Sequence, residues 1–135
     1  MNWPWRLICL SVVFGLLNQP AALASTKDME AMFGVWGQVD DKPEARGCRR
    51  YADRVEGNYF VLKKDGLVTG DSCACILEAS QSLGTCFEVN LFCRCEDGIT
   101  VRRRLQRLCP TQVRSRLDVI ENGETTSYER CRKRR

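Results

Sequence analysis

The segments Cys73-Ala74-Cys75 and Cys93-Arg94-Cys95 each place two cysteines one residue apart. Residues with this spacing on a β-strand point to the same face of the sheet. If the two segments pair antiparallel and in register, Cys73 faces Cys95 and Cys75 faces Cys93, which brings four sulfur atoms into one patch. The pattern predicts two neighbouring strands that are joined by two parallel disulfides.

Zinc is the alternative partner for four such sulfurs. Structural zinc sites do use thiolates, but their usual spacing is C-x2–4-C, and an oxidising compartment removes free thiols. Disulfides are therefore favoured, and we expect no metal and no other cofactor.

The N-terminus indicates that the chain enters an oxidising compartment. Arg6 precedes an apolar run from Leu7 to Leu17, and Ala22-Leu23-Ala24 forms an A-x-A cleavage site, as in a secretory signal peptide. The run is shorter than the roughly 20 apolar residues of a membrane span. We expect residues 1–24 to be removed and the mature protein to be exported, either to the periplasm or out of the cell, with no membrane span.

The remaining cysteines form a candidate disulfide framework. Cys9 leaves with the signal, and an even number in an exported chain indicates cross-links, although eight cysteines allow 105 connectivities. If the C-x-C pairs bond each other, Cys86 and Cys109 remain for one another or for Cys48 and Cys131. A Cys48–Cys131 bridge would fasten a barrel where its ends meet.

Residues 25–131 have the length of a single domain, and the basic tail 132–135 is expected to be disordered. Turn signals divide the domain into seven or eight short strands. Asn122-Gly123 supplies the two positive-φ residues of a type I′ hairpin turn, and Lys64-Asp65-Gly66 and Glu96-Asp97-Gly98 mark two further hairpins. The strands that these turns delimit are residues 34–40, 58–63, 67–77, 86–95, 99–108, 114–121 and 124–131.

Only residues 26–32 and 43–55 could be helical, and neither segment is long enough to build a helical core. The sequence therefore predicts a mainly β, disulfide-stabilised domain, either a small antiparallel barrel or a sandwich of seven to eight short strands. The barrel is favoured because closure leaves no open sheet edge.

Two motifs carry a resemblance to a known group of barrels. Phe33-Gly34-Val35-Trp36-Gly37 resembles the G-x-W opening of calycin-type barrels, such as lipocalins, avidins and small bacterial metalloprotease inhibitors. The close Tyr128-Glu129-Arg130-Cys131 is similar to that of small exported barrel proteins of Gram-negative bacteria. The resemblance implies a calycin-like barrel in which Trp36 closes one end and packs under Arg130. A barrel of this short length is expected to be filled by its own side chains.

Positive charge is concentrated in the C-terminal third of the chain. Residues 25–98 carry a net charge of −4, whereas residues 99–135 carry +7. In the strand predicted at 99–108, Val101 and Leu105 alternate with Arg102 and Arg104. We expect the two apolar residues to be buried and the two arginines to lie on the solvent face.

Two arginines of the next predicted strand belong to the same interpretation. Leu117 and Val119 mark its buried face, so Arg114 and Arg116 are expected in solvent. Together with Arg102 and Arg104 they form a predicted anion-binding surface. The alternative is a charged surface that serves only solubility.

Catalysis is not expected from this sequence. It contains no histidine, which removes the commonest general base, and carboxylate pairs such as Asp40-Asp41 lie in predicted loops. Nucleic acid is also not expected, because export separates the protein from it and only 11 aromatic residues occur.

These observations predict an exported, non-catalytic binding module. Its basic surface would contact anionic envelope components, namely acidic glycans, phosphorylated lipid head groups or acidic proteins. The alternative is a small protease inhibitor in which the mature N-terminus, residues 25–32, enters a protease cleft.

Overall fold

The structure is a computed structural model that describes residues 29–113 and 115–132. The predicted signal peptide at 1–24, Arg114 and residues 133–135 of the basic tail lie outside the described part, so the predictions about them stay predictions.

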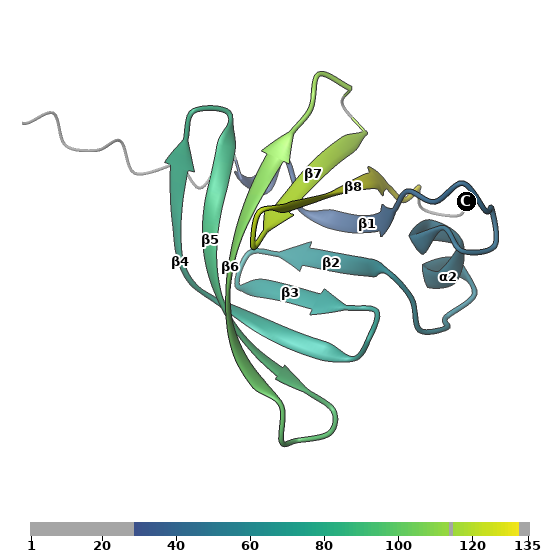
Figure 1. Cartoon of the computed structure of the whole chain (residues 1–135), viewed down its shortest axis with the longest axis horizontal. Coiled ribbons are helices and arrows are strands. Elements are labelled where there is room, and N and C mark those ends of the chain that lie inside the picture. The colour runs from purple at the N-terminus through teal and green to yellow at the C-terminus, as the bar shows by residue number, and fades with distance from the viewer. Residues whose placement is uncertain (1–28, 114, 133–135) are drawn as a thin grey trace, which may run out of the picture.

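Eight antiparallel strands form one closed barrel, in which each strand pairs with its neighbours in the sequence and the last strand pairs with the first (Figure 1). The predicted barrel is confirmed, and the sandwich is not formed. The strands are β1 (Gly34–Gln38), β2 (Tyr59–Lys63), β3 (Gly66–Thr69), β4 (Cys73–Leu83), β5 (Cys86–Cys95), β6 (Val101–Pro110), β7 (Arg116–Glu121) and β8 (Glu124–Arg130).

The turn signals locate the hairpins, with one correction. Asn122 and Gly123 have φ values of 52° and 80°, as a type I′ turn requires. The single strand predicted at 67–77 is wrong, because β3 ends at Thr69 and β4 starts at Cys73. Ser72 adopts a positive φ of 65° between them, and the chain reverses so that the two strands pair antiparallel.

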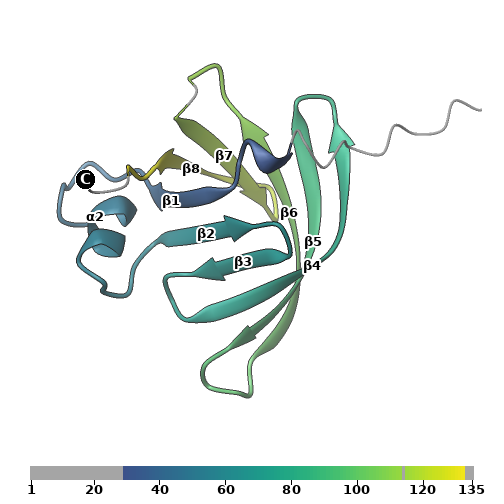
Figure 2. The same cartoon turned by 180° about the vertical axis from the view of Figure 1, so that it is seen from behind.

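A short helix, α2 (Gly47–Ala52), lies within the segment 43–55, one of the two segments that could be helical, and it sits outside the barrel beside β1 and β2 (Figure 2). Gly37 of β1 allows this close approach, since an added Cβ would lie 2.1 Å from the backbone nitrogen of Cys48. In the described part of the other such segment, 26–32, Met29 and Glu30 are helical.

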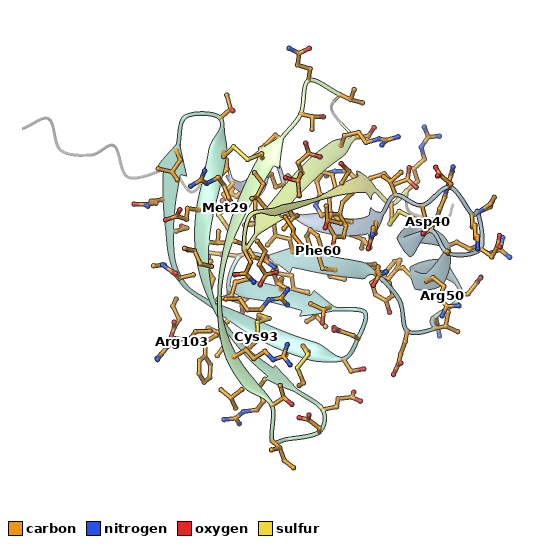
Figure 3. The ribbon with its side chains drawn as sticks, viewed as in Figure 1. Met29, Asp40, Arg50, Phe60, Cys93 and Arg103 are labelled. Atoms are coloured by element: carbon orange, nitrogen blue, oxygen red, sulfur yellow. A yellow bond between two sulfur atoms is a disulfide. The ribbon has the colours of Figure 1, made fainter. Side chains whose placement is uncertain are left out.

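The barrel interior is filled by side chains, as expected for its size. Figure 3 shows Phe60 and Cys93 directed inward and Arg103 directed outward from the wall. The side chains buried most completely are Val89, Leu91, Cys93, Leu108 and Leu117.

All eight predicted cysteines are joined in disulfides. The in-register pairing is confirmed, with Cys73–Cys95 and Cys75–Cys93 side by side across β4 and β5. Of the alternatives left open, the structure forms Cys86–Cys109 and Cys48–Cys131, and the second ties α2 to the end of β8. These bonds indicate an oxidising compartment. In the described residues, no helix is both long and apolar enough to cross a membrane.

Candidate functional site

The two ends of the barrel differ in chemistry, and one of them is closed. Trp36 is 2 % exposed, and its Nε1 donates a hydrogen bond of 2.7 Å to the carbonyl oxygen of Met32. The guanidinium of Arg130 lies 4.7 Å from the centre of the indole, and its Nη1 donates to the carbonyl oxygen of Phe33 at 3.3 Å. Trp36 and Arg130 therefore lie where the resemblance implied, beneath a cover that includes the buried side chain of Met29.

At the opposite end, the interior becomes polar along β6. Leu108 is completely buried in the core, Gln106 is 7 % exposed, and Arg104 is partly buried nearer the open end. These alternate residues share the inner face of the strand. The inner wall thus changes from apolar to charged as it approaches the opening, which we call the mouth.

This arrangement overturns the predicted faces of β6. Val101 and Leu105 are 47 % and 52 % exposed, so the apolar pair is on the outside. Arg104, which was expected in solvent, faces the interior instead. The reason is a partner on another strand, Glu121 of β7, which compensates the guanidinium inside the barrel.

Arg104 and Glu121 form a two-pronged ion pair in the mouth. Arg104 Nε donates to Glu121 Oε1 at 2.7 Å and its Nη2 donates to Oε2, while Gln106 Nε2 donates to Oε2 at 3.1 Å. The hydrogen bond from Arg104 holds the pKa of Glu121 below its usual value, against the opposing effect of burial. The same bond raises the pKa of Arg104. Both groups are therefore charged at neutral pH.

The pair predicts a pH-dependent contribution to stability. A carboxylate whose pKa is lowered by folding stabilises the protein fully above its unfolded value, near 4.5, and loses this contribution as the pH falls through the folded value. We expect the difference in unfolding free energy between the wild type and Glu121→Gln to shrink below about pH 4.5. Urea denaturation over a pH series measures it.

The matched control removes the cation first. In a protein that already carries Arg104→Gln, the change in unfolding free energy caused by Glu121→Gln should depend much less on pH. The reason is that the hydrogen bond from Arg104, the main cause of the lowered pKa of Glu121, is then absent. An equal pH dependence with and without Arg104 would contradict the interpretation that Arg104 lowers the pKa of Glu121.

A cavity of about 170 Å³ occupies the mouth. Its wall combines hydrogen-bonding groups with three aromatic rings, and two of them, Phe60 and Tyr128, meet edge to face with their centres 4.9 Å apart. Burial raises the pKa of Tyr128, so its phenol is neutral and can donate a hydrogen bond. No residue that the structure describes accepts one from it. The other lining residues are Gly57, Asn58, Tyr59, Leu67, Thr69, Asp71, Arg104, Gln106 and Val119.

A more open groove of about 520 Å³ lies at the rim of the mouth and shares Asp71 and Arg104 with the inner cavity. Arg102 and Asn122 also line it. Arg102 is exposed, and within residues 29–113 and 115–132 it forms no ion pair. It is therefore the arginine of the mouth that is available to an incoming anion.

Arg103 also lines the rim groove, but it is already paired, because its Nε lies 3.5 Å from Glu78 Oε2. Arg103 lies on the outside of the barrel, with its guanidinium 5.7 Å from the centre of the Phe92 ring. Arg116 is exposed at the start of β7, about 17 Å along the strand from Glu121. Arg114 lies outside the described residues. Of the four predicted arginines, Arg102 and Arg104 lie at the mouth and Arg116 does not, while the prediction for Arg114 stays a prediction.

Sequence reasoning missed Gln106, Glu121 and Tyr128 as members of the site. Arg104 and Gln106 are on the same face of β6 as the apolar Leu108, and this alternation was the signal that could have placed them inside. Glu121 and Tyr128 lie on β7 and β8, and only the pairing of strands brings them to β6.

The arrangement can hold a polar ligand by hydrogen bonds and one charge contact. In the part of the chain that the structure describes, no group of three or more Cys, Asp or Glu side chains is placed to bind a metal ion, and the four sulfurs considered for zinc are in disulfides. No known protein family, no curated protein and no solved structure matches this chain.

Proposed function

We propose that the protein is an exported, non-catalytic binding module, periplasmic or secreted, whose barrel mouth holds one end of an acidic glycan. The observation that carries this proposal is the lining of the mouth, where hydrogen-bonding side chains surround a small cavity and Arg102, which forms no ion pair within the described residues, stands at its rim. Sugar hydroxyls need such donors and acceptors, and a uronic carboxylate needs a guanidinium.

The size of the mouth supports an end-on ligand. The inner cavity of about 170 Å³ is smaller than the roughly 300–1,000 Å³ of common small-molecule sites, so it accepts only a sugar unit or two. The rim groove of about 520 Å³ gives the following units a path out of the barrel.

The charge distribution supports the same class of ligand. Arg104 and Glu121 neutralise one another, which leaves Arg102 for the acidic group. Across the groove, Asp71 accepts a hydrogen bond from the hydroxyl of Thr69 and can accept another from a sugar. Lipid is a poorer candidate, because the filled interior around Leu91 and Leu108 leaves no room for an acyl chain.

A single substitution tests the proposal. Arg102→Ser should weaken binding of a glucuronate-containing oligosaccharide by about 10- to 100-fold, the loss expected for one charge-assisted contact. Stability should be unchanged, because Arg102 is exposed and outside the core. Isothermal titration calorimetry at low salt measures the affinity, and denaturant midpoints measure the stability.

Two controls sharpen this experiment. Arg116→Ser removes another exposed arginine, at the other end of the barrel, and should leave binding intact. The carboxyl-reduced oligosaccharide should bind the wild type about as weakly as the acidic one binds Arg102→Ser. Equal affinity of the wild type and Arg102→Ser for the acidic ligand would contradict the proposal.

The inhibitor alternative receives less support. It requires residues 25–32 to enter a protease cleft, but Met29 and Met32 are buried in the core and the carbonyl oxygen of Met32 is bonded to Trp36. At most residues 25–28, which lie outside the described part, are left for that role.

A further inference from the structure

The second half of β4 extends beyond the strand that precedes it. β3 pairs with β4 only from Ala74 to Ile76, and the amide of Leu77 donates to the carbonyl oxygen of Asp65 at 2.9 Å. Among the described residues, the segment 79–83 then pairs with β5 alone. Figure 1 shows this part of β4 at the margin of the molecule, with no strand on its other side.

The backbone groups that this edge leaves free can be identified. Leu83 and Cys86 flank a two-residue turn, so their backbone N–H and C=O groups hydrogen-bond to each other. Along an antiparallel strand, every second residue directs its backbone N–H and C=O groups to a given neighbour, so Leu83 and Gln81 bond to β5. Ser80 and Ser82 therefore direct their backbone N–H and C=O groups away from β5, toward the open edge of the sheet.

Apart from the irregularity at its start, between Leu77 and Ala79, this edge lacks the usual protection against pairing. Proteins guard open edges with charged side chains, proline or bulges. The mouth-side half of β6, which also extends beyond its neighbour β7, carries three consecutive arginines, Arg102, Arg103 and Arg104. Residues 79–83 contain no charge and no proline after the irregularity between Leu77 and Ala79.

The sequence of the edge is also suited to pairing with itself. Ala79-Ser80-Gln81-Ser82-Leu83 reads almost the same in both directions around Gln81. Antiparallel pairing about a two-fold axis at Gln81 would set Ser80 of each copy opposite Ser82 of the other. These are the residues with outward backbone groups, so about four new hydrogen bonds could form.

We propose that two copies of the protein dimerise through this edge and join their barrels into a continuous sheet across β4. The side chains at the axis are compatible with it. Gln81 is uncharged, and its Nε2 already donates to Glu88 Oε1 at 2.8 Å, so no like charges oppose one another. The mouth is formed by other residues, so the dimer is independent of the proposed ligand.

A charge placed on the axis tests the dimer. Gln81→Lys sets two ammonium groups directly opposite each other, and Gln81→Glu does the same with two carboxylates. Each variant alone should raise the dimer dissociation constant at least about tenfold, whereas an equimolar mixture should recover a dimer with one copy of each. Sedimentation velocity over a concentration series measures the first effect, and native mass spectrometry identifies the mixed dimer.

Two further variants keep the test specific. Asn90→Lys adds the same charge on the neighbouring strand, away from the edge, and should leave dimerisation unchanged. Ser82→Pro removes one outward N–H without touching the bonds to β5, and it should weaken the dimer. A wild type that remains monomeric at all concentrations, or a mixture of the Lys and Glu variants that does not pair, would overturn the proposal.

Discussion

Replacing Trp36 with alanine is expected to lower the free energy of unfolding by about 3–5 kcal/mol, the usual cost of removing a buried aromatic side chain. Trp36 is 2 % exposed, and its loss leaves a cavity beneath Arg130 and an unbonded carbonyl oxygen at Met32. Guanidinium denaturation followed by far-UV circular dichroism measures the change. Fluorescence is unsuitable because Trp36 is the only tryptophan after residue 28.

A surface aromatic provides the control for this substitution. Tyr51 of α2 is 41 % exposed and packs edge to face on Tyr59, with ring centres 5.3 Å apart. Tyr51→Ala should cost much less, on the order of 1 kcal/mol. Equal losses in the two variants would show that Trp36 does not close the barrel.

The second large effect is expected from the bridge that joins α2 to the end of β8. Cys48 and Cys131 are separated by 83 residues, so their bond constrains most of the unfolded chain. Chain-entropy arguments give a stabilisation of about 4.5 kcal/mol for a loop of this length. The double variant Cys48→Ala/Cys131→Ala, which leaves no unpaired thiol, should lose about this much in chemical denaturation.

The bond between Cys86 and Cys109 is the matched comparison. Its separation is 23 residues, and the same argument gives about 3.4 kcal/mol. The Cys86→Ala/Cys109→Ala variant should therefore be the more stable of the two. The reverse order would mean that strain or packing at the bridges, rather than loop length, determines their contributions.

The fold was predictable where the sequence carries local signals. Asn122-Gly123 requires a particular turn, and the C-x-C spacing defines the register of β4 against β5 without knowledge of any other strand. The turn between β3 and β4 was missed because it is only a few residues long and contains Gly70 and Asp71. Apolar residues precede and follow this turn, so the segment 67–77 was interpreted as one strand.

The site was less predictable because its members come together only through strand pairing. On β6 both faces mix arginine with other residues, so alternation alone cannot say which face is inside. Arg104 lies inside because its guanidinium reaches the carboxylate of Glu121, 17 residues later in the chain, which the β6–β7 connection brings within hydrogen-bond distance. The position of Arg104 thus depends on Glu121, a residue of another strand that the alternation within β6 does not reveal.

The pairing of β1 with β8 sets a time during synthesis when the chain is vulnerable. β1 can pair with β2 soon after it is made, but its other edge must wait for β8, and Trp36 must wait for Arg130. At about 5–20 residues per second, this interval lasts on the order of 5–20 s. Throughout it, the indole lacks its cover and β1 has one open side, so the barrel seam is where a nascent chain is most exposed to aggregation.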